Sequence, residues 1–157
     1  MRRVLIVGRG GAGKSTLAEA LGLLMEVPVI ELDKHFWQPG LRPLTPEDWT
    51  VVQQGLAAQP GWVMDGDLGP YDVLSGRLSH ADTVILLDYG FVVCAWRAAR
   101  RSREGRNFWL WVWHYRRRHL EGVLSAVAEH APGVTVFRLR SPRATRAWLR
   151  ALPSEGG

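Results

Sequence analysis

One stretch near the amino terminus decides the fold: Val4-Leu5-Ile6-Val7-Gly8-Arg9-Gly10-Gly11-Ala12-Gly13-Lys14-Ser15. Its first four residues form an unbroken aliphatic run, which predicts a strand buried on both faces of a parallel sheet. From Lys14 onward, leucines recur at helical spacing until Pro28, which predicts a helix directly after the turn. The turn itself matches G-x-x-x-x-G-K-[ST] in full, the pattern of a loop that curls its backbone N–H groups around phosphate oxygens.

The residue types in this loop predict the chemistry of its ligand. Lys14 would reach the terminal phosphates of a nucleotide, and the Ser15 hydroxyl would ligate Mg²⁺. We therefore expect ATP and Mg²⁺ as ligands. The residues expected to hold the nucleotide through the loop are Gly8, Gly10, Gly11, Ala12, Gly13, Lys14, Ser15 and Thr16.

A rival interpretation uses the same glycines. Gly8, Gly10 and Gly13 also satisfy G-x-G-x-x-G, and Glu31 lies about where a dinucleotide-binding fold places its ribose-binding acid. The Lys14-Ser15 pair favours the phosphate loop, because a dinucleotide site has no terminal phosphate or Mg²⁺ for that pair to bind.

Strands and helices alternate along the rest of the chain. Further strands are predicted over 29–32, 62–64, 83–87 and 134–139. The intervening helices begin near Thr45, Phe91, Leu120 and Ser141. Alternation of this kind predicts an α/β fold with right-handed crossovers and a parallel sheet covered on both faces.

Composition limits the number of domains and the cellular location that we expect. The 157 residues, 46% apolar and 22% charged, suit one domain over 1–157. No apolar run approaches the roughly 20 residues of a membrane span, and the run after Arg3 is too short for an export signal. The lone cysteine, Cys94, cannot form an internal disulfide, so we expect a cytoplasmic protein.

The net charge of +5 is unevenly distributed. Residues 1–90 carry 7 basic and 11 acidic side chains, whereas 91–157 carry 13 basic and 4 acidic ones. The second part therefore needs an anionic partner, which could be nucleotide phosphates, a nucleic acid backbone or an acidic partner protein.

Several motifs together resemble one family. The only asparagine is Asn107, so the N-K-x-D sequence of guanine-specific proteins is absent. The phosphate loop, 32–37 (LDKHFW), 64–67 (MDGD) and 81–88 (ADTVILLD) resemble the nucleoside monophosphate kinase and shikimate kinase superfamily, closest to bacterial DNA topology modulation (adenylate-kinase-like) proteins. The resemblance implies a five-stranded parallel sheet in the order 2-3-1-4-5, a short helical lid, and phosphoryl transfer from ATP to a small molecule.

The same resemblance implies roles for single residues. Asp65 matches the aspartate that holds a Mg²⁺-bound water, and Arg97 and Arg101 match arginines that contact adenine and the transferred phosphate. Arg140 and Ser141 fall where the family contacts the adenine edge. Asp33 matches an aspartate near the acceptor hydroxyl, where it would act as a base, a Mg²⁺ neighbour or a substrate ligand. The expected catalytic residues are Lys14, Asp33, Arg97 and Arg101.

One departure concerns the acceptor. Adenylate kinases follow the D-G pair with a proline and a phosphate-binding arginine, whereas this chain continues with Asp67, Leu68 and Gly69. Because Asp67 would repel a phosphate, we expect an acceptor other than an ordinary nucleoside monophosphate. Replacement cations for that contact are Lys34, Arg42 and Arg77.

The segment 102–118 is dense in tryptophan and arginine and falls where such kinases carry a lid. Its tryptophans favour packing against the core or a partner copy, so either a monomer or a homodimer fits. Alternatively, aromatic and basic side chains could form a platform for single-stranded nucleic acid. The alternative function is thus a nucleotide-dependent regulatory or nucleic-acid-binding protein.

Overall fold

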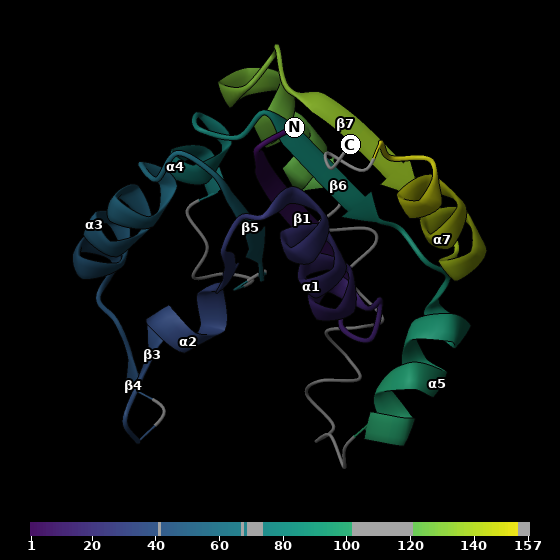
Figure 1. The fold of residues 1–157 in the computed structure, drawn as a ribbon. Helices are drawn as coiled ribbons and strands as arrows, with labels where there is room; N and C mark the ends of the chain where they lie inside the picture. Colours follow the sequence, from purple (N-terminus) through teal and green to yellow (C-terminus); the bar gives the residue numbers. More distant parts are fainter. Residues whose placement is uncertain (41, 67, 69–73, 102–120, 154–157) are drawn as a thin grey trace.

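The computed structural model describes residues 1–40, 42–66, 68, 74–101 and 121–153, with the backbone alone for 98–101 (Figure 1). The lid predicted over 102–118 lies outside the described residues. None of the described helices combines the length and the apolar character that a bilayer crossing demands.

Five parallel strands form the central sheet. They are β1 (Arg3–Gly8), β2 (Val29–Glu31), β5 (Trp62–Asp65), β6 (Thr83–Leu87) and β7 (Thr135–Leu139). Their order across the sheet is β2-β5-β1-β6-β7. In chain order these are the first to fifth strands of the sheet, so the predicted order 2-3-1-4-5 is confirmed.

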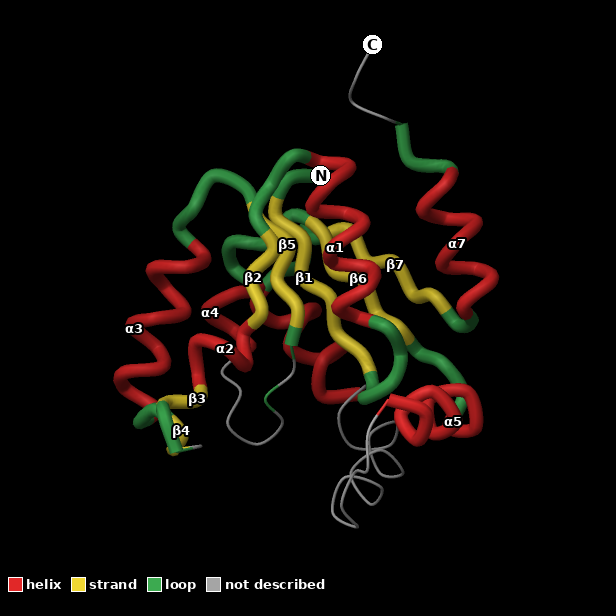
Figure 2. The backbone as a smooth tube through the Cα atoms, turned by 60° about the horizontal axis from the view of Figure 1, so that its bottom comes forward, coloured by secondary structure: helices red, strands yellow, loops and turns green. Residues whose placement is uncertain are grey.

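Helices cover both faces of the sheet (Figure 2). They include α1 (Lys14–Met25), α3 (Pro46–Ala57), α4 (Leu74–Leu78), α5 (Phe91–Arg101), α7 (Pro142–Arg150) and a helix over 121–130. Side chains from α1 and α7 pack on the face that carries Val4 and Ile6. Those from α3, α4 and 121–130 pack on the face that carries Leu5 and Val7. Because β1 is covered on both sides, its aliphatic run needs no polar alternation.

The region after β2 differs from the prediction. The strand was expected to continue through Leu32, but it ends at Glu31 and Leu32 begins the short helix α2 (Leu32–Phe36). A helical turn places Leu32 and Phe36 on one side, and both are buried in the core. A two-stranded hairpin, β3 (Trp37–Gln38) and β4 (Arg42–Pro43), then leads to α3; the sequence reasoning did not predict this hairpin.

Candidate active site

The phosphate loop depends on glycine at specific positions. A Cβ on Gly8 would lie 2.9 Å from both Cβ and the carbonyl oxygen of Leu87, so only glycine lets β1 end this close to β6. Gly11 and Gly13 have φ of +77° and +91°, a region that other residues rarely adopt. The turn is closed by the Ala12 N–H, which donates to the Arg9 carbonyl over 3.1 Å.

The loop leads into the amino terminus of α1, where backbone N–H groups gather. Gly13 is the N-cap of this helix and supplies no side-chain acceptor, and the first turn carries no acidic residue. The first N–H groups of a helix have no intrahelical acceptor, and the helix dipole adds partial positive charge there. Both features favour an anion at this end of the helix.

Lys14 and Ser15 begin α1 as the motif predicts. Lys14 Nζ donates to the carbonyl oxygen of Gly8 over 2.9 Å, so its ammonium group lies back across the loop. Ser15 is half-buried in the first helical turn, and Thr16 beside it is exposed. All three side chains belong to the turn whose N–H groups would face phosphate oxygens.

A cleft of about 590 Å³ opens beside the loop. Its walls come from the loop, α1, the end of β6, α5 and α7. The lining residues are Gly11, Ala12, Gly13, Thr16, Leu17, Ala20, Tyr89, Trp96, Arg97, Pro142, Thr145, Arg146 and Leu149. The cleft is mostly apolar and has cations at its rim, a combination suited to a nucleotide base with its phosphates on the loop.

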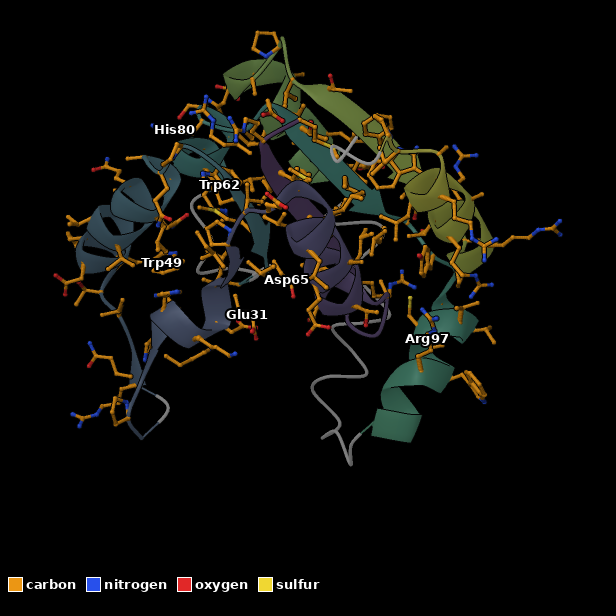
Figure 3. All side chains as sticks on the ribbon, viewed as in Figure 1. Glu31, Trp49, Trp62, Asp65, His80 and Arg97 are labelled. Carbon is orange, nitrogen blue, oxygen red and sulfur yellow. The ribbon has the colours of Figure 1, made fainter. Side chains whose placement is uncertain are left out.

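Arg97 of α5 lies against the loop (Figure 3). Its Nη1 donates to the Ala12 carbonyl oxygen over 3.3 Å. The same nitrogen would be 3.4 Å from a Cβ on Gly13. Arg101 ends α5, and its side chain lies outside the described part of the chain.

The two residues expected at the adenine edge lie just before the cleft wall. Arg140 is exposed after β7, and the Ser141 hydroxyl accepts from the Ala144 N–H over 3.1 Å as the N-cap of α7. The lining begins one residue later, at Pro142.

Sequence reasoning missed much of the cleft wall. Pro142, Thr145, Arg146 and Leu149 recur at helical spacing on α7, a signal visible in the sequence once that face is known to meet a cleft. Tyr89 follows β6, and its hydroxyl is hydrogen-bonded to the Thr145 hydroxyl. Burial raises the pKa of Tyr89, so it stays a neutral wall residue.

Two carboxylates lie on the other side of β1. Asp65 ends β5 and is buried, and Glu31 is its register partner at the end of β2 (Figure 3). Asp65 Oδ1 has no hydrogen-bond partner among the described residues. Glu31 is paired with Lys34 of α2. Sequence reasoning considered Glu31 only as a ribose ligand, whereas the register of two adjacent strands places it beside Asp65.

Asp33 and the replacement cations lie around α2, α3 and α4. Asp33 is exposed on α2, one residue before Lys34. Arg42 is exposed on β4. Arg77 is fully buried and donates from Nη1 to Gln53 Oε1 over 2.7 Å, which joins α4 to α3. In this arrangement, Arg77 braces two helices.

The residues present fit a nucleotide with Mg²⁺. Positive φ at Gly11 and Gly13 lets the loop backbone curl as phosphate binding requires, and the Ser15 hydroxyl and the unpartnered Asp65 oxygen are the hard donors that Mg²⁺ prefers. Within the described ranges, no three His, Cys, Asp or Glu side chains gather in a metal cage. Mg²⁺ needs no such cage, because it is usually bound through one or two protein groups, water and phosphate.

No protein-family model and no curated protein matches the chain. Solved structures of several small-molecule kinases do match. Shikimate kinase from Acinetobacter baumannii in complex with shikimate is 16% identical with a TM-score of 0.59, covering 96% of this chain and 89% of that one. A sugar kinase from Janibacter sp. HTCC2649 is 20% identical with a TM-score of 0.56, covering 99% and 96%. Deoxyadenosine kinase from M. mycoides is 11% identical with a TM-score of 0.52, covering 94% of each chain.

At these identities the likeness establishes the fold. The chain has the α/β fold of P-loop kinases that act on small molecules, as the sequence predicts. The narrower resemblance to DNA topology modulation proteins stays a prediction.

Proposed function

We propose that this protein is a kinase that transfers a phosphoryl group from ATP, with Mg²⁺, to a small-molecule acceptor. The observation that supports it best is the position of the complete phosphate loop, which has an apolar cleft with a cation on one side and two carboxylates on the other. On the β6 side lies the cleft with Arg97, and on the β5 side lie Glu31 and Asp65. Ligands of open parallel sheets bind at the carboxyl ends of the strands, and all these residues are there.

The donor nucleotide would occupy the loop and the cleft. Its phosphates would be held by Gly8, Gly10, Gly11, Ala12, Gly13, Lys14, Ser15 and Thr16. Lys14 and Arg97, with Arg101 as a further candidate, would neutralise phosphate oxygens. Phosphoryl transfer is catalysed mainly by positioning and charge neutralisation, so these cations carry most of the expected rate enhancement. Arg140 and Ser141 remain candidates for the base edge, next to Pro142 in the cleft wall.

Ser15 and Asp65 would hold the metal ion. When bound, Mg²⁺ would neutralise charge on the phosphate oxygens. Asp65 suits this role because one of its oxygens is buried without a hydrogen-bond partner among the described residues. A carboxylate left in that state is costly, so a cation or its water shell would satisfy it.

The acceptor would bind near α2. Asp33 would orient or deprotonate its hydroxyl. Lys34 of α2 and Arg42 of β4 are exposed, and these two elements lie on the same side of the molecule (Figure 1). We place Arg77 outside this contact, because it is buried against Gln53. The identity of the acceptor is left to experiment. We also propose that the chain is a single domain over 1–157 and that residues 102–118 act as its lid.

The test is transfer of label from γ-labelled ATP to a panel of nucleosides, nucleotides and hydroxylated metabolites. We expect a labelled product that is lost when a chelator removes Mg²⁺. Calorimetry with ATP, a nicotinamide dinucleotide and a flavin should give heat with ATP alone. Uptake of a dinucleotide without ATP binding would contradict the proposal. A blank panel together with salt-sensitive DNA binding would favour the nucleic-acid function instead.

A further inference from the structure

Arg9, the second residue of the phosphate loop, has an unusual environment. It is only 4% exposed, although arginine is rarely this buried without partners. Its guanidinium carbon lies 5.9 Å from the centre of the Phe91 ring, at the start of α5. That distance is within the range of a cation–π contact. The side chain is therefore held between the loop and α5.

Two of the three nitrogens of this guanidinium have no hydrogen-bond acceptor within the described part of the chain. Both Nε and Nη1 are buried and lack an acceptor there. The two other cations at the loop differ, since Lys14 donates to the Gly8 carbonyl oxygen and Arg97 of α5 donates to that of Ala12. Buried polar groups are nearly always paired, so an exception of this kind needs an explanation.

The electrostatics of the loop point the same way. Burial raises the pKa of the Cys94 thiol, while the charges of Arg9, Arg97 and Lys14 act to lower it, so all three cations lie close enough to act on this one buried group. Asp88, whose charge acts in the opposite sense there, is bound by Arg138 over 2.8 Å. The amino terminus of α1 adds partial positive charge to the same region.

We propose that Arg9 is a phosphate-binding residue of the loop, whose buried guanidinium donates to an oxygen of the bound polyphosphate. This inference rests on the proposed function, because it assumes that the loop holds nucleotide phosphates. The ring of Phe91 holds the guanidinium in place through its apolar face and leaves the N–H edges for an anion. Guanidinium groups suit this role because their planar donors match phosphate oxygens.

The proposal predicts opposite effects of one substitution on stability and on binding. A buried charge without a partner costs folding free energy, so replacing it with an apolar side chain should not destabilise the protein. Arg9→Met should therefore unfold at the same temperature as wild type or higher without ligand. Tripolyphosphate and Mg²⁺-ATP should then raise its unfolding temperature by less than half of the wild-type shift. Arg143→Met, at an exposed arginine of α7 outside the cleft, is the matched control and should keep the full shift.

Calorimetry with tripolyphosphate provides a second measurement. Arg9→Gln, which keeps a polar side chain, should bind at least about tenfold more weakly than wild type, the effect of losing a charge-assisted hydrogen bond. If Arg9→Met does not fold, or if it unfolds at a lower temperature and keeps the full ligand shift, then Arg9 only stabilises the fold and the inference is wrong. Unchanged affinity of Arg9→Gln would overturn it equally. Wild-type protein that responds to neither ligand would overturn the proposed function as well.

Discussion

Arg97 Nη1 donates to the carbonyl oxygen of Ala12 over 3.3 Å and so joins two segments that are 85 residues apart in the sequence. The bond attaches α5 to the phosphate loop. It also places a guanidinium next to the N–H groups that would hold phosphate, which gives the strongest structural support for a role of Arg97 in transfer.

Arg97→Gln should lower the rate of phosphoryl transfer by about 10²–10³-fold, the loss seen when one preorganised donor is removed from an active site. The expected cause is reduced neutralisation of phosphate oxygens. Steady-state kinetics with labelled ATP would measure it. Arg150→Gln, an exposed position on α7 outside the cleft lining, should leave the rate unchanged. Equal rates for Arg97→Gln and wild type would contradict the assigned role.

Lys14→Met should abolish detectable transfer and leave the fold intact. Lys14 makes one half-buried hydrogen bond to a loop carbonyl, so its loss should cost only about 1 kcal/mol of stability. Circular dichroism and urea unfolding would monitor the fold, and the transfer assay the activity. Turnover at the wild-type rate would show that the ammonium group takes no part in the reaction.

Gly8→Ala should destabilise the protein by about 1–3 kcal/mol, because the new Cβ would lie 2.9 Å from backbone and side-chain atoms of Leu87. Gly55→Ala is the matched control: a Cβ at this position in α3 meets nothing within 4 Å. That change should stabilise the protein by about 0.5–1 kcal/mol, through helix propensity. Urea unfolding of both variants would test the pair. A tolerated alanine at position 8 would show that β1 and β6 can separate.

Asp82 should make the free energy of unfolding depend on pH in the acidic range. Burial acts to raise the pKa of Asp82, but the N–H groups of Arg2 and Arg3 and the Thr83 hydroxyl outweigh it and hold the pKa below the ordinary value of 3.8. A carboxylate with a lowered folded-state pKa stabilises the protein above the unfolded-state pKa and loses this effect as pH falls through the folded-state value.

Asp82→Asn should therefore be less stable than wild type at pH 7, by about 1 kcal/mol given partial exposure to solvent. The difference should shrink as the pH falls below 3.8. Unfolding midpoints measured at both ends of this range would check it. A difference that is constant with pH would show that the carboxylate charge is not what stabilises the amino terminus.

Much of the fold could be predicted because its signals are local. The run from Val4 to Val7 and the glycine turn each occupy consecutive residues, and periodicity marks the helix that follows. The hairpin of β3 and β4 could not be predicted in this way, since each strand has two residues and Pro43 forms part of the pairing. The turn of helix at Leu32 was missed because burial of Leu32 and Phe36 in the core, a tertiary effect, overrides the β-propensity of the preceding residues.

In the candidate site, too, some features follow from local sequence and others from tertiary packing. By itself the sequence determined that a glycine-rich turn at residues 8–15 joins the first strand to the first helix, because conformations with positive φ and close strand contact require glycine at known positions. Only the tertiary structure decided that Glu31 lies beside Asp65, that α7 lines the cleft, and that Arg9 is buried against Phe91. These contacts join residues far apart in the chain, so they depend on the order of strands and the packing of helices, which no local pattern encodes.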